Sequence, residues 1–300
     1  AFRPDLADAS LRGRVEAARF TAGKPMQVIA HAAPVHREPR PDAPLDTEAL
    51  CGEEVAVFEI EEGWAWGQLS SDGYVGYLPA ERLGPPGPNA THRVACIRSF
   101  AYPGPSMKLP CVSALSLGSR LHVLDREGDF AVVTGVAGLA RAYVWAAHLA
   151  PLDKHAPDPA AVAELLLHAP YLWGGKSSLG LDCSGLAQLA FDAVGIALPR
   201  DSDQQERGPG TPLPLDQGAL RRGDLVFWKG HVGLMQDGTR LLHANGHHML
   251  VASEPLQEAA ERILAKGGGP ITSLRRVVQQ GAGDDTLDEV FTSLSEPFQP

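Results

Sequence analysis

One cysteine in this sequence stands where a helix is expected to begin. Cys183 directly follows Asp182, a good N-cap residue, and Gly195 is a natural stop. Apolar residues recur between them at helical spacing: Leu186, Leu189, Ala190 and Val194. The unpaired backbone N–H groups and the positive dipole end of a helix favour a thiolate, so the sequence predicts a reactive thiol at Cys183.

Two histidines further along the chain are candidate bases for that thiol. His231 begins an expected strand, HVGLMQ, and His243 ends the next one, RLLHANG. The turn over 236–239 can bring these two strand ends side by side. Because a cysteine nucleophile needs a base within hydrogen-bond reach and a third group that fixes the tautomer of the base, we expect Cys183, His231 and His243 to form a row.

Other interpretations of these residues stay open. A cysteine at a helix start is more often an inert small residue, and an isolated strand histidine is more often structural. Cys183 and the histidines, with the adjacent pair His247 and His248, are also candidate zinc ligands, although the close ligand spacing typical of zinc sites is absent. GGKSS resembles the end of a phosphate loop, but the required first glycine falls at Pro170. We therefore expect no metal and no organic cofactor.

The elements that must position these residues lie in the C-terminal half of the chain. Asp158 and Pro159 start a helical run, AAVAELLLHA, and a long polar loop is expected over 199–220. Strand-like runs follow at DLVFW, HVGLMQ, RLLHA and ITSLRRVV. Helices first and antiparallel strands after them predict an α+β domain over 153–281, with a C-terminal tail over 282–300.

Two β-rich segments precede this domain. Residues 27–85 and 90–152 both consist of short alternating runs separated by Gly, Pro and Asp, which is typical of small barrels. A constant offset of 66 residues relates them and pairs, for example, Trp64 with Phe130. We expect a multidomain chain with a duplicated all-β barrel, preceded by an N-terminal helical arm over 1–26.

Composition and charge exclude several classes of partner. Lys+Arg at 26 against Asp+Glu at 36 gives 26 − 36 = −10, and no basic block is present to attract a phosphate backbone. No apolar run approaches the roughly 20 residues that span a bilayer. We therefore expect binding neither to nucleic acid nor to a membrane. The oligomeric state stays open, and a monomer is expected.

Cysteine usage favours a reduced compartment. If Cys183 is catalytic, an odd number of cysteines remains, namely Cys51, Cys96 and Cys111, and no CxxC pair occurs. A disulfide between Cys96 and Cys111 is an alternative, but buried free thiols are commoner. A cytoplasmic location is expected, and a periplasmic or secreted one stays open if a signal peptide has been removed.

Several separated motifs together resemble a known family. YLWGG, LDCSGL, RRGDLVFW with HVGL, and LLHA occur in the order and spacing of the NlpC family of papain-like cysteine peptidases, which cut bacterial cell-wall peptides. The match covers 158–278. The two repeats resemble bacterial SH3 domains. This resemblance implies two SH3-like barrels followed by an α+β papain-like peptidase domain.

The resemblance also implies roles for individual residues. Cys183 matches the nucleophile, His231 the general base and His243 the third, orienting residue. The hydroxyl of Tyr171 and the backbone N–H of Cys183 match the oxyanion hole. Further positions match the substrate pocket: Trp173, Asp182, Ser184 and Ser202. For Trp173 the alternative is a core aromatic, and for Ser202 it is a helix cap.

One subgroup with two leading barrels comprises γ-D-glutamyl-L-diamino-acid endopeptidases that require a free N-terminal L-Ala. In that subgroup an acidic residue and a tyrosine of the first barrel bind the amino group, and the matching positions here are Asp46 and Tyr74. Asp46 replaces the expected glutamate and is shorter by one methylene. Tyr74 falls opposite Ala140 in the second repeat, so it is present in one copy only, which favours recognition over folding.

The resemblance therefore predicts a cysteine endopeptidase that cuts murein peptides between D-Glu and the diamino acid, in recycling of released peptides. One alternative is a broad wall hydrolase with the barrels as wall binders. A second is a papain-like amidase or acyltransferase acting on lipid, for which no apolar anchor is present. A third is a non-catalytic peptide-binding or wall-binding module.

Overall fold

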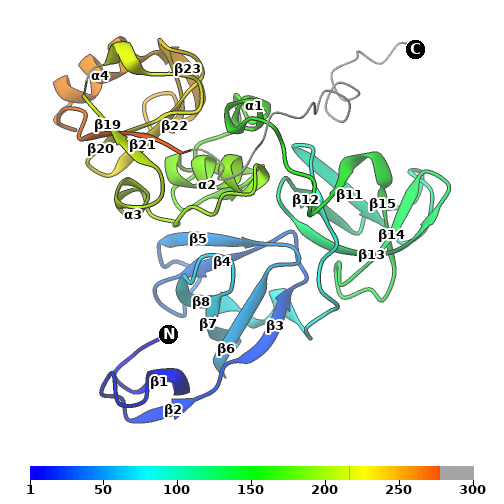
Figure 1. Ribbon diagram of the computed structural model, residues 1–300. Helices are drawn as coiled ribbons and strands as arrows, with labels where there is room; N and C mark the ends of the chain where they lie inside the picture. The colour runs from blue at the N-terminus through cyan, green and yellow to red at the C-terminus, as the bar shows by residue number, and fades with distance from the viewer. Residues whose placement is uncertain (216, 278–300) are drawn as a thin grey trace.

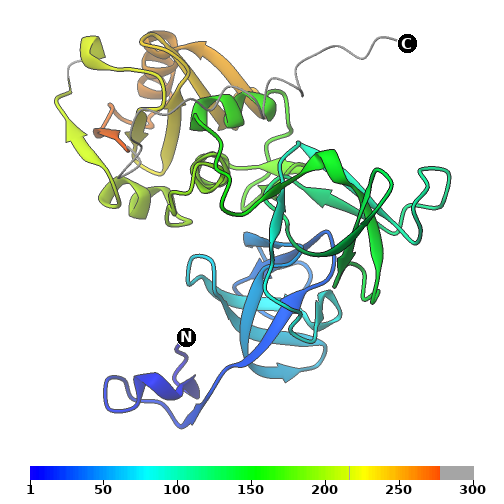
Figure 2. The same cartoon turned by 45° about the vertical axis from the view of Figure 1, so that its right-hand side comes forward.

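The computed structural model describes residues 1–215 and 217–277, and it divides the chain into two barrels and an α+β domain (Figure 1). The barrels lie next to each other, and both lie against the α+β domain (Figures 1 and 2). The domain limits 27–85, 90–152 and 153–281 remain our proposal. Residues 282–300 lie outside the described residues.

The first barrel is a sheet of seven strands in the order β5-β4-β8-β7-β6-β3-β9. Its strands are β3 (Lys24–Val28), β4 (Ala32–His36), β5 (Leu45–Leu50), β6 (Glu54–Glu61), β7 (Trp64–Leu69), β8 (Val75–Pro79) and β9 (Leu83–Gly84), with a 3₁₀ turn η2 (Ala80–Arg82) before β9. Alternate residues of β6, Val55 and Val57, enter the barrel core, as period-2 patterning requires.

The second barrel repeats this topology, with the order β12-β11-β15-β14-β13-β10-β16. Its elements are β10 (His92–Val94), β11 (Arg98–Tyr102), β12 (Ser113–Ser116), β13 (Arg120–Glu127), β14 (Phe130–Thr134), β15 (Ala142–Trp145), η3 (Ala146–His148) and β16 (Leu149–Pro151). The β-bulge between Val57 and Glu59 recurs between Val123 and Asp125, at the predicted offset of 66 residues. The duplicated barrel is therefore confirmed.

The N-terminal helical arm predicted for 1–26 is wrong. This segment contains β1 (Leu6–Asp8), η1 (Ala9–Leu11) and β2 (Arg19–Thr21), with β1 and β2 paired in parallel. Gly13 at φ 78° interrupts the helical spacing. Leu6 instead packs against Phe58 and Trp66 of the first barrel.

The C-terminal domain places helices on both faces of an antiparallel sheet with the order β19-β24-β20-β21-β22-β23. Its elements are α1 (Pro159–Leu165), β17 (Lys176–Ser177), β18 (Gly180–Leu181), α2 (Cys183–Ala193), α3 (Ser202–Arg207), β19 (Thr211–Leu213), η4 (Gln217–Ala219), β20 (Leu225–Trp228), β21 (His231–Met235), β22 (Arg240–Asn245), β23 (Leu250–Pro255), α4 (Leu256–Ala265) and β24 (Ser273–Arg276). The α+β prediction is confirmed, but the predicted 199–220 loop contains α3, β19 and η4.

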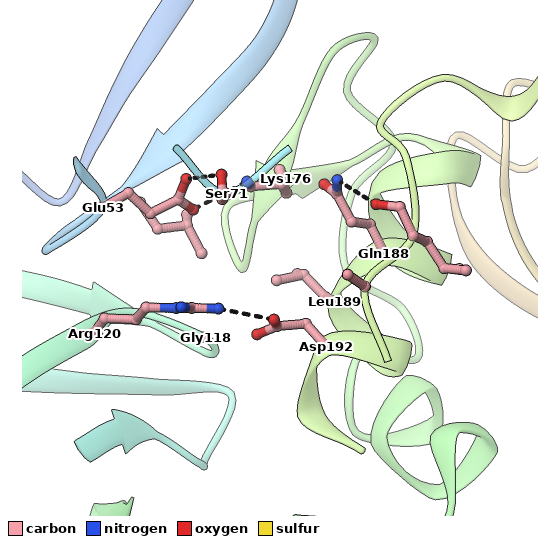
Figure 3. A pocket seen from close by; sticks show the side chains of 11 residues that line it. Glu53, Ser71, Gly118, Arg120, Lys176, Gln188, Leu189 and Asp192 are labelled. Carbon is pink, nitrogen blue, oxygen red and sulfur yellow. Dashed lines mark hydrogen bonds and ion pairs between the residues drawn. The ribbon is translucent and has the colours of Figure 1, made fainter. Parts of the chain in front are cut away.

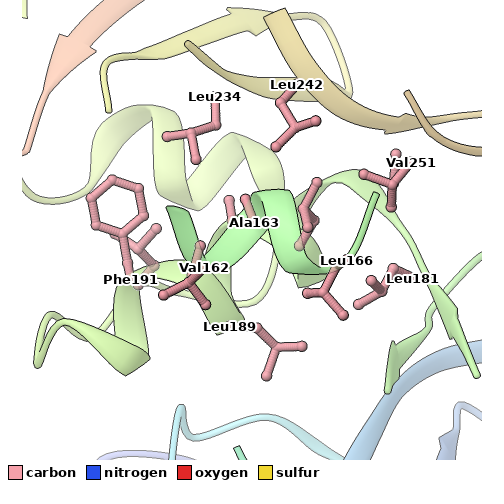
Figure 4. Packing of buried hydrophobic residues seen from close by; sticks show 14 of the residues in the cluster. Val162, Ala163, Leu166, Leu181, Leu189, Phe191, Leu234, Leu242 and Val251 are labelled. Carbon is pink, nitrogen blue, oxygen red and sulfur yellow. The ribbon is translucent and has the colours of Figure 1, made fainter. Parts of the chain in front are cut away.

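Alternation along the central strands explains this layering. In β20, Leu225 and Phe227 face the core shared with α1 and α2, whereas Val226 and Trp228 face the core shared with α4. Figure 4 shows the first of these cores, where Phe191 of α2 lies among side chains of α1 and the sheet. The sheet thereby fixes α2, and with it Cys183, against β21 and β22.

All four cysteines are free thiols, so the alternative disulfide between Cys96 and Cys111 is absent. Within 1–215 and 217–277, no helix has both the length and the apolar character needed to cross a bilayer.

Candidate active site

Cys183 is the first residue of α2, as the sequence predicts. Asp182 caps the helix, since its Oδ1 accepts a hydrogen bond from the backbone N–H of Gly185 at 2.7 Å. The Cys183 side chain packs beside the core between α2 and the sheet and is half-buried. Its thiol lies near the backbone of Val232, which follows His231 in β21. Cys183 therefore lies against β21, the strand that begins with His231.

The two histidines lie side by side, as the strand turn predicted. His231 Nε2 and His243 Nδ1 are 2.8 Å apart. Two further residues, which the sequence analysis did not predict, extend this pair of histidines. His243 Nε2 lies 2.7 Å from Glu254 Oε1, and Arg262 in turn donates to Glu254. Both nitrogens of His243 are thus used in hydrogen bonds, which suits an orienting role rather than metal ligation.

Burial sets the resting protonation of the cysteine and histidine pair. It raises the pKa of Cys183 to about 11, and the Asp182 carboxylate adds to this effect. Burial and the neighbouring His243 lower the pKa of His231 to about 3. Both shifts favour the thiol and the neutral imidazole over the charged forms, whereas the helix start favours a thiolate. Neutral His231 has the protonation state that a general base requires.

Tyr171 lies beside the nucleophile. Burial raises its pKa to about 12, with further contributions from Cys183 and Asp182, so the phenol stays protonated and can donate. The backbone N–H of Cys183 has no hydrogen-bond partner within the described part of the chain. Two donors are thus available near the sulfur for a developing oxyanion.

Asp182 and Ser184 are engaged by a buried arginine that the sequence reasoning missed. Arg200, 2% exposed, donates to both oxygens of Asp182, at 3.0 and 2.7 Å, and to Ser184 Oγ at 2.7 Å. Asp182 Oδ2 also accepts from the backbone of Gly174 at 3.0 Å. These contacts fix the start of α2. No local pattern marks Arg200, because it stands in a polar segment between Pro199 and Asp201.

The structure excludes the alternative roles of Trp173 and Ser202. Trp173 is 68% exposed, so it is not a core aromatic. Ser202 is the first residue of α3, and the N-cap is Asp201, so Ser202 is not the helix cap either. Both side chains remain candidates for substrate contact.

Asp46 and Tyr74 lie together at the boundary between the first barrel and α3. They line one cavity of about 540 Å³ with Arg37, Arg200 and Gln204. Asp46 already has a partner in the exposed Arg37, whose Nη2 lies 3.0 Å from Oδ1. Burial raises the pKa of Tyr74 to about 12, so its hydroxyl is a neutral donor.

Both barrel segments that bear these residues are tied to the C-terminal domain. Arg200 Nε donates to Thr47 Oγ1 at 2.7 Å, next to Asp46. Gln188 of α2 donates to Asp72 Oδ2 at 3.0 Å, two residues before Tyr74. Gln188 of α2 and Arg200, which precedes α3, thus hold the two barrel segments that line the cavity.

A further junction joins all three domains (Figure 3). Glu53 of the first barrel and Lys176 form a buried ion pair at 3.0 Å. Arg120 of the second barrel and Asp192 of α2 form a partly exposed ion pair at 2.9 Å. The side chain of Leu189 lies between these pairs (Figure 3).

Comparisons with known proteins agree with this geometry. Two family profiles match the chain: the bacterial dipeptidyl-peptidase SH3 domain over 35–83, and the NlpC/P60 family over 168–264. The γ-D-glutamyl-L-lysine dipeptidyl-peptidase of Bacillus subtilis (strain 168) is 31% identical over 225 residues, which are 68% of this chain and 73% of that protein. Dipeptidyl-peptidase 6 of Lysinibacillus sphaericus is 28% identical over 237 residues, which are 73% and 86% of the two chains.

A solved structure shows the same fold. The crystal structure of an NlpC/P60 family protein from Bacillus cereus superimposes with a TM-score of 0.72 at 21% identity, covering 85% of this chain and 100% of that one. The fold of this chain thus recurs over the full length of that protein.

Proposed function

Because this chain belongs to the NlpC/P60 family of cysteine peptidases, we propose that it hydrolyses murein peptides between γ-D-glutamate and the L-diamino acid, and that it requires a free N-terminal L-Ala. The observation that supports this most is the cavity shared by Asp46, Tyr74 and Arg200, which is joined to Cys183 through Asp182. An open cavity lined by charged side chains at this place suits the end of a short peptide.

The proposed chemistry uses residues already described. As His231 takes the thiol proton, the sulfur of Cys183 attacks the γ-carbonyl carbon, and Tyr171 with the Cys183 N–H stabilises the oxyanion. His231 then gives its proton to the leaving amine, which leaves a thioester. A water molecule, deprotonated by His231, attacks the thioester and releases the free γ-carboxylate and the thiol. His243 and Glu254 orient the imidazole throughout.

The cavity also explains the proposed preference for released peptides. Burying a carboxylate next to the bound peptide costs free energy unless a cation neutralises the carboxylate. A peptide whose amine is acylated, as in intact wall, brings no such cation and should be rejected. We therefore propose a role in the recycling of released peptides.

The test is mass spectrometry after incubation with L-Ala-γ-D-Glu-meso-diaminopimelate and its N-acetylated form. We expect cleavage of the free-amine peptide only, with no turnover by Cys183→Ala or His231→Ala. Cleavage of neither peptide by the wild type would contradict the peptidase proposal. Equal cleavage of both, together with binding to purified sacculi, would instead support the broad wall hydrolase.

A further inference from the structure

The carboxylate beside His243 has both of its oxygens occupied. Glu254 of β23 is buried, and its Oε1 lies 2.7 Å from His243 Nε2. Arg262 of α4 donates to both oxygens, one from each terminal nitrogen. A guanidinium group that binds a carboxylate through two parallel hydrogen bonds fixes the orientation of that carboxylate. Arg262 therefore holds Glu254 against His243 from the neighbouring helix.

The packing of α4 on the sheet sets the position of Arg262. Leu256 and Ala259 are buried in the core between α4 and the sheet. Arg262 follows Ala259 by three residues, which places it on the same side of the helix. The two other ionisable groups near this pair are His248, whose Nδ1 lies 3.9 Å from Glu254 Oε1, and Glu258, one helical turn before Arg262.

The hydrogen bonds assign the protons of both histidine rings. With Arg262 beside it, Glu254 is ionised and can only accept, so the proton between them lies on His243 Nε2. Burial lowers the pKa of both histidines and so favours neutral rings, each with one N–H. His243 Nδ1 is then an acceptor, and His231 Nε2, 2.8 Å away, must donate to it. Nδ1 of His231 is thereby left without a proton.

We propose that Glu254 and Arg262 are positioning residues that act through His243 and set the tautomer of His231, so that Nδ1 accepts the Cys183 proton. This proposal rests on the proposed function, in which His231 is the base. Because Nε2 of His231 is engaged with His243, Nδ1 is the nitrogen left for the thiol. In the opposite arrangement both rings carry their proton on Nδ1, and His231 cannot accept a second one there without becoming charged.

Glu254→Gln should produce this opposite arrangement, and Arg262 is the reason. The amide oxygen must turn toward the donors of Arg262, so the amide nitrogen faces His243 and donates to Nε2. Both rings then carry their proton on Nδ1. We expect kcat for L-Ala-γ-D-Glu-meso-diaminopimelate to fall by about 100-fold or more, with KM changed by less than about twofold, because binding groups are untouched.

A double variant tests the part played by Arg262. Glu254→Gln with Arg262→Met frees the amide to rotate, so its oxygen can again accept from His243. The double variant should therefore have a higher kcat than Glu254→Gln alone, although it lacks two native groups. Glu258→Gln is the matched control, since Glu258 is exposed on the same helix, and its kcat should stay within about twofold of the wild type. A lower kcat in the double variant than in Glu254→Gln would contradict the proposal.

Nitrogen NMR of the histidine rings separates this proposal from the proposed function, because it needs no substrate. Long-range proton–nitrogen correlation distinguishes a protonated ring nitrogen from an unprotonated one. We expect protonated Nε2 in His231 and His243 of the wild type, and protonated Nδ1 in both rings of Glu254→Gln. A proton on His231 Nδ1 in the wild type, or the same tautomers in both proteins, would overturn the role of Glu254 even if the peptidase activity is confirmed. The expected tautomers without cleavage of the peptide would overturn only the reaction.

Discussion

At the scale of single residues, the candidate site combines a neutral thiol with a neutral base. Cys183 has a raised pKa and His231 a lowered one, both because the groups are buried. Burial would also raise the pKa of Glu254, but hydrogen bonds from His243 and Arg262 outweigh it and lower the pKa to about 2. This permanent negative charge lies at the far end of the histidine row. It can stabilise the imidazolium that forms at His231 during the attack.

The pH dependence of kcat/KM should report this arrangement. His231 acts as a base only when neutral, and its pKa of about 3 keeps it neutral throughout the usual range. We therefore expect no activity loss as the pH falls from 7 to about 5. On the basic side, activity should fall near pH 8, where the α-amino group of the substrate loses the proton that the cavity recognises. Initial rates on the free-amine peptide would measure both limbs, with thermal melts as a control for folding. An acid limb near the ordinary histidine value of about 6.5 would contradict the neutral pair.

At the scale of elements, the start of α2 is stabilised by an ion pair as well as by its N-cap hydrogen bond. Asp182 accepts the Gly185 N–H and also carries the charge that neutralises Arg200. The side chain of Arg200 contacts both Asp182, at this helix start, and Thr47 in β5. One aspartate therefore joins a helix start, a buried cation and a neighbouring domain.

Asp182→Ala should destabilise the protein far more than the loss of a cap alone. Removing one partner of a buried ion pair costs about 3–5 kcal/mol, because the remaining charge stays buried. Asp158→Ala is the matched control, since Asp158 caps α1 but pairs only with the partly exposed Arg222. Its expected cost is about 0.5–2 kcal/mol. Urea unfolding would measure both, and equal costs would show that Arg200 does not depend on Asp182.

The helices and strands that carry short-range signals were predictable, and long-range partners were not. The cap of α2 by Asp182 and the two histidine strands follow from local patterns. Arg200 contacts Asp182, 18 positions away in the chain, and Glu254 contacts His243, 11 positions away. No neighbouring residue in the sequence indicates either contact. The helix predicted over 1–26 is absent because Leu6, the first residue of the helical spacing, packs on the first barrel.

At the scale of the whole molecule, the three domains form one unit around α2. The first barrel contributes Glu53 and Thr47 to this contact, and the second contributes Arg120 (Figure 3). The barrels also touch each other closely, since the N–H of Arg120 donates to the carbonyl of Cys51 at 2.9 Å. The second barrel therefore braces both the first barrel and the helix that bears the nucleophile.

Breaking the ion pair between Lys176 and Glu53 should loosen this unit. Both side chains are nearly fully buried, so Lys176→Met leaves an unpaired carboxylate and should cost about 3–5 kcal/mol. KM should rise, because the wall of the cavity is no longer fixed. The double variant Lys176→Met with Glu53→Leu should recover most of the stability.

Arg207→Met, at an exposed ion pair, is the control, with an expected cost below about 1 kcal/mol. If the double variant were as unstable as the single one, the unpaired charge would not be the cause.

The two barrels share one strand order but make different contacts with the rest of the chain. The first copy presents Asp46 and Tyr74 to the cavity, whereas the second copy has Ala140 at the position of Tyr74 and contacts α2 instead. We therefore expect substitutions in the loops of the first copy to change peptide preference, and substitutions where the second copy contacts α2 to change stability. The duplicated barrel would then separate evolutionary change in recognition from change in domain packing.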